Sequence, residues 1–140
     1  MKIYTRVGDS GETRLIGGIS TDKTDLRVVV CGELDELNAV IGLAVSFGLP
    51  ESIGHTIGAV QEALFDAGAI VAAVGSGSGR VPEFDWSLRT GELERSIDCI
   101  EESLRPLRSF ILPGGSTPGA SLHLARTVCR RCERQYVALL

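Results

Sequence analysis

The chain has 140 residues, of which 44% are hydrophobic and 23% are charged, and these values are ordinary for one globular domain spanning residues 1–140. A formal net charge of −4 without a long basic run gives little support to nucleic-acid binding, so any site for a polyanion must be a local group of Arg and Lys. No stretch approaches the ~20 apolar residues of a membrane span, and the N-terminus lacks the apolar region of a signal peptide. We therefore expect a cytoplasmic protein without nucleic-acid or membrane partners.

The chain begins with a glycine-rich segment and continues into two amphipathic helices. Residues 1–24 show no helical period and contain several glycines, which predicts an extended or looped lead-in. Over residues 25–47 apolar side chains recur at spacings of three and four, and Gly48-Leu49-Pro50 ends this helix. A second helix is predicted over residues 51–74. The expected inward residues of the two helices are Val30, Leu34, Leu37, Ile41, Ala44, Ile53, Ile57, Val60, Leu64 and Val71.

Two further helices complete the predicted fold. Residues 91–104 carry apolar side chains at near-heptad spacing, and Pro106 closes this helix. Its expected inward residues are Leu93, Ile97, Ile100 and Leu104. An apolar turn over residues 110–119 leads to a fourth helix, over residues 120–140. Four helices with short connections predict an all-α, up-and-down helical bundle with negligible strand content.

The four cysteines are expected to be reduced. They are Cys31, Cys99, Cys129 and Cys132, in a chain with enough core to fold without a disulfide framework. Cys129 and Cys132 form a C-x2-C motif, but no second such pair follows. Helical spacing places both on the apolar side of the last helix, so we expect buried thiols and no metal site.

Charged side chains form a stripe along the last predicted helix. At roughly 100° per residue, His123, Arg126, Arg130 and Glu133 fall within about 80° of one another, and Arg134 lies beside them. Arg outnumbers acid on this stripe, and the planar guanidinium suits phosphate and carboxylate groups. Periodicity alone leaves open whether the stripe is an anion site or a solvated surface.

Two other polar features, Asp35 and the segment from Thr5 to Thr13, are also candidates for function. Asp35 lies on the flank of the apolar side of the first helix, where it could orient an Arg through an ion pair between helices or subunits. The segment from Thr5 to Thr13 has the chemistry of a phosphate-cradling loop, because glycines let backbone N–H groups approach an anion and Arg6 adds charge. It is neither a Walker A loop nor a Rossmann fingerprint. By itself, a flexible N-terminus fits it equally well.

Three ordered motifs together resemble the PduO-type ATP:corrinoid adenosyltransferase family over nearly the whole chain. The first reads Tyr4-Thr5-Arg6-Val7-Gly8-Asp9-Ser10-Gly11-Glu12-Thr13, with Lys23 and Arg27 at the matching downstream places. The second reads Asp35-Glu36-Leu37-Asn38, followed by Ile41-Gly42-Leu43-Ala44. The third joins Phe110-Ile111-Leu112-Pro113-Gly114-Gly115-Ser116 to the run from Leu122 to Arg134. Family members continue into a fifth helix that is absent from this chain.

The resemblance implies a homotrimeric helical bundle with active sites between subunits. The implied ATP-binding residues are Thr5, Arg6, Val7, Gly8, Asp9, Thr13, Lys23, Arg130, Glu133 and Arg134. Val7 stands where the family has a second Thr, so backbone N–H groups would take over its part. Arg130 would be catalytic together with Arg126 and Asp35, which would pair across the subunit boundary. Phe110 would pack below the corrin and exclude its lower axial ligand.

The implied reaction moves the 5′-deoxyadenosyl group of ATP to the cobalt of cob(I)alamin, with Mg²⁺ assisting. Reduced cobalt is itself the nucleophile, so positioning and charge stabilisation remain as the tasks of the protein. A cobalamin-dependent client enzyme is a further partner that this activity allows. The alternative is a non-catalytic helical module that binds nucleotide or corrinoid without turnover.

Overall fold

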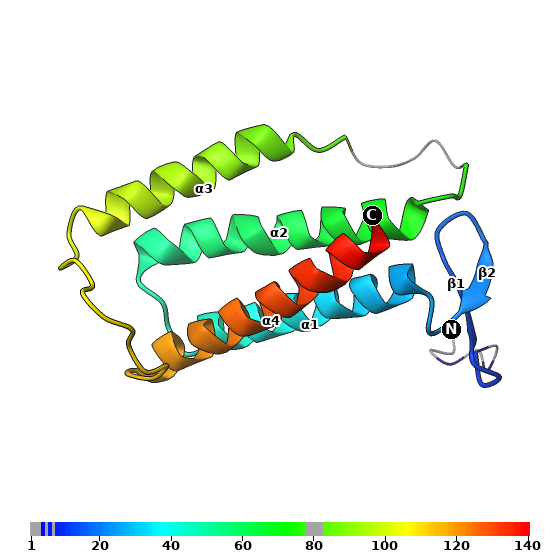
Figure 1. Cartoon of the computed structure of the whole chain (residues 1–140), viewed down its shortest axis with the longest axis horizontal. Coiled ribbons are helices and arrows are strands. Elements are labelled where there is room, and N and C mark those ends of the chain that lie inside the picture. The colour runs from blue at the N-terminus through cyan, green and yellow to red at the C-terminus, as the bar shows by residue number, and fades with distance from the viewer. Residues whose placement is uncertain (1–3, 5, 7, 78–82) are drawn as a thin grey trace.

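The computed structural model describes residues 4, 6, 8–77 and 83–140. It consists of the helices α1 (Leu26–Ser46), α2 (Glu51–Ala73), α3 (Trp86–Glu101) and α4 (Thr117–Leu139), with a two-stranded hairpin in front of them. The helices alternate in direction along the long axis of the molecule (Figure 1). The predicted up-and-down bundle of four helices is confirmed.

Among the described residues, a short hairpin is the only β-structure. Strand β1 (Glu12–Arg14) pairs antiparallel with β2 (Ser20–Asp22), and Thr13 lies opposite Thr21. Each strand has three residues, which is too few to show the period of two that identifies a strand in sequence. The prediction of an almost entirely helical chain is confirmed, and this small hairpin is an addition that the sequence analysis did not identify.

Helix boundaries follow local capping. Asp25 accepts a hydrogen bond from the backbone N–H of Arg27 and begins α1 where the spacing predicted. The start of α3, expected at residue 91, lies at Trp86, because the Asp85 carboxylate accepts from Leu88 N at 2.9 Å. Gly91 thus lies inside the helix. A side-chain cap and not the apolar pattern determines this boundary.

The core lies on both sides of α1, which packs against α2 and α4. Its buried cluster consists of Leu37 and Ile41 from α1 with Ala125 and Val128 from α4. Half-buried side chains of α1 and α2 pack against this cluster, namely Val40, Ile57, Val60 and Leu64. The predicted inward faces of α1 and α2 are thus largely confirmed. α1 is therefore the central helix, and α2 and α4 pack against it.

A buried polar pair fixes the register of α2 on α1. Asn38 is 8% exposed, and its side-chain N–H donates to the backbone carbonyl of Gln61 at 3.2 Å. The Gln61 amide donates in return to Asn38 Oδ1 at 2.8 Å and to its carbonyl at 3.2 Å. Sliding the helices would leave these buried polar groups without partners, which costs about 1–3 kcal/mol per group.

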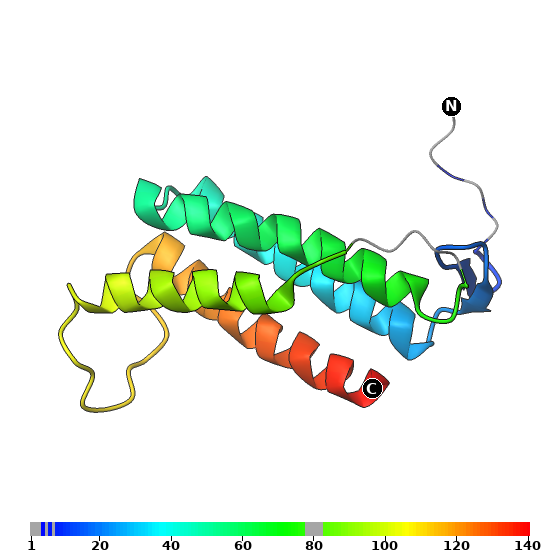
Figure 2. The same cartoon turned by 90° about the horizontal axis from the view of Figure 1, so that it is seen from above.

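Within the described part of a single chain, the apolar face of α3 is not buried. Leu93, Ile97 and Ile100 are between 37% and 54% exposed, and α3 has no buried residue. Leu104, expected in the same helix, lies beyond its end at Glu101 and is 61% exposed. Figures 1 and 2 show α3 running along the outside of the bundle beside α2. The expectation that this face joins the core of the chain is wrong.

Helix α2 is long and apolar enough, by length and composition alone, to cross a bilayer. The expectation that no stretch has this character is therefore wrong for Glu51–Ala73. The helix also pairs Gln61 with Asn38 and packs three side chains against the core cluster, as the core helix of a bundle does.

The cysteines differ in accessibility, and this makes their chemistry testable. Cys132 is buried and Cys31 half-buried, whereas Cys99 and Cys129 are exposed. The prediction that Cys129 faces inward is wrong, because it follows buried Val128 by a 100° turn that carries it out of the contact with α1.

We expect a thiol reagent at pH 8 to label Cys99 and Cys129 rapidly and the other two thiols slowly. Burial raises the pKa of the Cys31 and Cys132 thiols, so less of each is the reactive thiolate. Mass spectrometry of the native protein checks this, with a Cys99→Ser, Cys129→Ser double variant as control. Labelling of Cys132 as fast as that of Cys99 would contradict the packing of α4 on α1.

Candidate nucleotide and corrinoid site

The glycine-rich segment is folded onto the end of the hairpin by Lys23. The Lys23 ammonium donates to the carbonyl of Gly8 at 2.7 Å, and its backbone N–H donates to the carbonyl of Gly11 at 2.9 Å. A Cβ at position 8 would lie 3.0 Å from the carbonyl oxygen of Glu12, so only glycine fits without a shift. The structure thus brings Gly8, Asp9, Thr13 and Lys23 of the predicted ATP-binding set into one segment.

The remaining N-terminal residues of that set are placed only in part. Arg6 is exposed and has a φ of 58°, a left-handed conformation that is uncommon for a residue with a side chain. Its guanidinium lies 5.3 Å from the centre of the Tyr4 ring. Thr5 and Val7 lie outside the described residues.

An ion-pair cluster lies at the base of the hairpin, and the sequence did not reveal it. Asp25 accepts from Arg27 at 2.7 and 3.0 Å and from the Thr21 hydroxyl at 2.8 Å. The Arg27 guanidinium, and after it the Thr21 hydroxyl, hold the pKa of the Asp25 carboxyl well below its usual range. Arg27 also donates to the carbonyl of Val74, beyond the end of α2, at 2.9 Å.

The charged stripe on α4 faces away from α1. Arg126, Arg130, Glu133 and Arg134 are all exposed, while Ala125, Val128 and Cys132 form the buried side of the helix. The predicted helical arrangement is therefore confirmed. Arg134 donates to the backbone carbonyl of Arg130 at 2.9 Å, which lies one turn earlier. His123 is half-buried beside the stripe.

Arg131 carries the ionic contact between α4 and α1, and the prediction assigned it no role. Its Nε donates to the Glu33 carboxylate at 2.6 Å, and its Nη2 donates to Glu36. Glu36, and then Glu33, raise the pKa of the guanidinium. The recognisable signal was a pair of acids three residues apart on α1. Since Arg131 bridges both, it holds the rotation of α4 that turns Arg130 outward.

Asp35 and Arg126 are both exposed. Asp35 is exposed and borders a cavity of about 290 Å³ whose walls include Ile16, Leu64 and Phe65. Among the described residues no ion pair joins Asp35 to Arg126. Their pairing across a subunit boundary stays a prediction.

Phe110 lies in the connection between α3 and α4 and is fully solvent-exposed, at 105%. Leu107 and Leu112 in the same connection are 74% and 92% exposed. Phe110 is therefore not a core residue of this chain. An apolar segment this exposed marks a surface that contacts another molecule.

Both proposed nucleotide-binding elements point to one end of the molecule. The hairpin stands beside the start of α1, and α4 runs toward the same end (Figures 1 and 2). The hydrogen bonds of Lys23 remain within the N-terminal segment.

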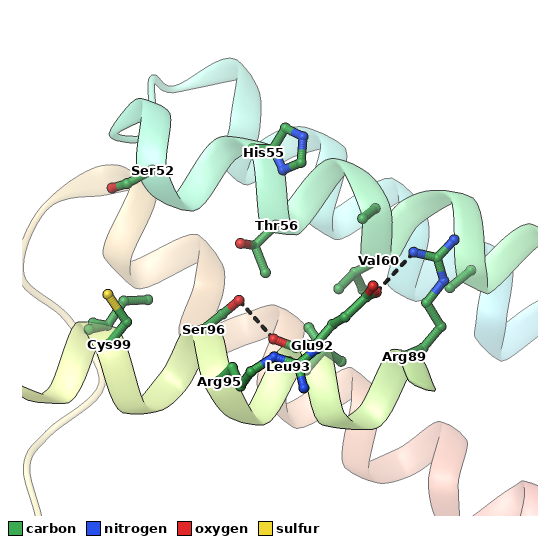
Figure 3. Close-up of a pocket in the computed structure, with 13 residues that line it drawn as sticks. Ser52, His55, Thr56, Val60, Arg89, Glu92, Leu93, Arg95, Ser96 and Cys99 are labelled. Carbon is green, nitrogen blue, oxygen red and sulfur yellow. Dashed lines mark hydrogen bonds and ion pairs between the residues drawn. The ribbon is translucent and has the colours of Figure 1, made fainter. Parts of the chain in front are cut away.

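A second cavity lies away from these residues. It is a groove of about 520 Å³ between α2 and α3, and its labelled walls include His55, Arg89, Glu92 and Cys99 (Figure 3). Arg89 and Ser96 donate to Glu92 within α3, to its carboxylate and its carbonyl. The groove is lined by α2 and α3 alone, so it is separate from the predicted ATP and corrinoid residues.

Comparison with known proteins identifies the family. The family model described as cobalamin adenosyltransferase matches residues 3–140. A corrinoid adenosyltransferase of Bacillus subtilis (strain 168) is 43% identical over 147 residues, covering 100% of this chain and 72% of the relative. One from Mycobacterium leprae (strain TN) is 43% identical over 138 residues, covering 95% of this chain and 72% of the relative.

Similarity to solved structures points to the same family. A phenylalanine-to-alanine variant of the PduO-type ATP:corrinoid adenosyltransferase from Lactobacillus reuteri, complexed with cobalamin and ATP, matches with a TM-score of 0.90 and 37% identity, covering 99% of this chain and 77% of that one. An arginine-to-lysine variant from the same organism, complexed with ATP, matches with a TM-score of 0.87 and 37% identity, covering 98% and 77%. The chain belongs to the PduO-type cobalamin adenosyltransferase family.

Proposed function

We propose that this chain transfers the 5′-deoxyadenosyl group of ATP to the cobalt of cob(I)alamin and releases triphosphate. Similarity to corrinoid adenosyltransferases over the whole chain carries this conclusion. The exposed arginine stripe of α4 and the Lys23 hairpin supply the cations that the reaction requires at one end of the fold.

The reaction is a substitution at the 5′-carbon of ATP. The electron pair of Co(I) forms the cobalt–carbon bond as the bond from C5′ to the triphosphate oxygen breaks. The triphosphate leaves with the electron pair of the broken C5′–O bond, and cobalt becomes formally Co(III). The protein holds the two reactants in line and places Arg130, Arg134 and Lys23 where negative charge develops on the leaving group.

We further propose that Mg²⁺ enters with ATP. Mg²⁺ keeps several waters and binds through phosphate oxygens with one or two carboxylates. In the described part of the chain no three His, Cys, Asp or Glu side chains gather as a metal cage. Asp9 and Glu133 are the acids among the predicted ATP-binding residues, and they would be the carboxylates beside the ion.

A homotrimer with sites between subunits completes the proposal. No ion pair joins Asp35 to Arg126 in the described part of one chain, and apolar side chains of α3 and of the 107–112 connection are exposed. A second copy would supply partners for both. A cytoplasmic location fits the exposed free thiols of Cys99 and Cys129, which a reducing compartment protects.

The decisive experiment follows adenosylcobalamin formation spectrally. The protein is mixed with ATP, Mg²⁺ and chemically reduced cobalamin, and product and triphosphate are expected in equal amounts. Chelation of Mg²⁺ is expected to stop the reaction. Corrinoid binding without product over hours would instead identify the non-catalytic module.

Phe110→Ala is expected to lower turnover strongly while leaving the thermal midpoint unchanged. The side chain is fully exposed in the chain, so it contributes no packing to the fold. Its proposed task is to exclude the lower ligand of cobalt, which makes Co(I) easier to form. The assay is run with cobalamin supplied as Co(I) and with cobalamin supplied as Co(II). Leu107→Ala in the same connection serves as control. Equal activity of both variants would remove Phe110 from the corrin site.

A further inference from the structure

Arg27 joins the start of α1 to the end of α2. Its Nε and Nη2 donate to the two oxygens of Asp25, at 3.0 and 2.7 Å, in a bidentate pair. Its Nη1 donates to the carbonyl of Val74 at 2.9 Å, 47 residues along the chain. One guanidinium thus bridges two helix ends.

Asp25 extends this contact into the hairpin. Its Oδ2 accepts from the Thr21 hydroxyl at 2.8 Å, and Thr21 belongs to β2. The strand continues into Lys23, whose two donors hold the carbonyls of Gly8 and Gly11. Hydrogen bonds therefore link Val74, Arg27, Asp25 and Thr21, the chain itself leads from Thr21 to Lys23, and Lys23 bonds to the glycine-rich segment.

Arg27 is more fully hydrogen-bonded than Arg126, Arg130 and Arg134, the arginines of the α4 stripe. A guanidinium has five N–H donors, and the contacts above use Nε and both terminal nitrogens. The Arg27 and Asp25 side chains are 19% and 24% exposed. Arg126, Arg130 and Arg134 are exposed. Arg27 is therefore built into the fold and is poorly placed to bind phosphate directly.

We propose that Arg27 and Asp25 are positioning residues for ATP, acting through Thr21 and Lys23. This inference rests on the proposed adenosyltransferase function. The pair holds the hairpin against the ends of α1 and α2. The backbone amides and the Lys23 ammonium are thus already in their binding positions before the triphosphate binds. Holding a binding loop in its bound form improves affinity because less ordering remains to be done on binding.

The test compares Asp25→Asn, Arg27→Gln and the double variant. Asn remains a good N-cap, so Asp25→Asn keeps the start of α1 while weakening the ion pair. Each single variant is expected to raise the KM and the Kd for ATP roughly tenfold, the size expected when a charged hydrogen bond is lost. The KM for corrinoid is expected to stay unchanged. The double variant should be no worse than the poorer single one, because the two residues act as one unit.

Matched controls come from α3. Arg89 and Glu92 form an exposed ion pair at 3.0 Å on the outer helix. Arg89→Gln and Glu92→Gln make the same chemical changes and are expected to leave the KM for ATP unchanged. Thermal midpoints are measured for every variant.

Several outcomes would overturn the inference. If Arg27 bound phosphate itself, Arg27→Gln would weaken the binding of ATP. Asp25→Asn would not weaken it, because this change frees the Arg27 guanidinium. If the pair served stability alone, the midpoint would fall and both KM values would rise together. If either variant fails to fold, Thr21→Val removes only the hydroxyl contact, and a wild-type Kd for ATP in that variant would refute the inference.

The proposed function is judged separately, on the wild-type protein. ATP binding measured by calorimetry needs no turnover, so the positioning inference is tested even in a protein that forms no adenosylcobalamin. A wild-type chain that binds no ATP would overturn both.

Discussion

Arg130→Ala is expected to abolish adenosylcobalamin formation and to leave the fold intact. The side chain is exposed on the face of α4 turned away from the core, so its removal disturbs no buried contact. Its proposed task is to stabilise the negative charge that develops on the triphosphate. Loss of one such preorganised group lowers turnover on the order of 10²–10³-fold. Turnover is measured with saturating ATP and cob(I)alamin, and folding by helical circular dichroism.

Two further variants make the Arg130 experiment specific. Arg130→Lys keeps the charge but loses the planar fork, so we expect only partial recovery of turnover. Arg95→Ala removes an exposed arginine from α3, away from the arginine stripe, and is expected to retain full activity. Wild-type turnover in Arg130→Ala would refute the assignment of this residue, whatever ATP affinity remained.

Leu37→Ala is expected to destabilise the chain by about 2–5 kcal/mol, the range for a buried leucine. Leu37 is 5% exposed and belongs to the cluster in which α1 meets α4, with α2 side chains packed against it. Since domains of this kind are stable by only about 5–15 kcal/mol, the variant would be near the limit of folding. Its activity is expected to fall with its folded fraction, because α4 carries the arginine stripe.

Urea unfolding measures this effect, and the same helix offers a matched control. Leu43→Ala makes the same chemical change at a position that is 48% exposed, so we expect a much smaller loss of unfolding free energy. The midpoint should fall for Leu37→Ala without a change in the slope of the transition. Equal losses in the two variants would show that Leu37 is not part of a packed core.

The helical part of the fold was predictable because it is determined by local sequence patterns. Apolar spacing and capping residues determine α1, α2 and α4 to within a few residues, whether or not the rest of the chain is present. The same spacing arranged Arg126, Arg130 and Glu133 as one outward stripe. The family motifs at Tyr4–Thr13 and Asp35–Asn38 needed only residue order to be recognised.

Local patterns were misleading where a neighbouring segment decides the outcome. The apolar residues of α3 have the spacing of a core helix, yet no other described segment of the chain buries them. Cys129 has the residue type and the helical spacing of an inward-facing position. Its burial nevertheless depends on how α4 is rotated against α1. The β1–β2 pairing depends on strands too short to have a pattern.

By itself, the sequence determined the helices, their order, the charged stripe and the family, because each of these depends on residues close together in the chain or on an ordered set of motifs. Only the tertiary structure decided the contacts of Arg131 with Glu33 and Glu36 and of Arg27 with Val74. These contacts join residues 47 to 98 positions apart. A guanidinium finds such partners only after helix packing has brought them within hydrogen-bonding distance, and no spacing along the chain records that distance.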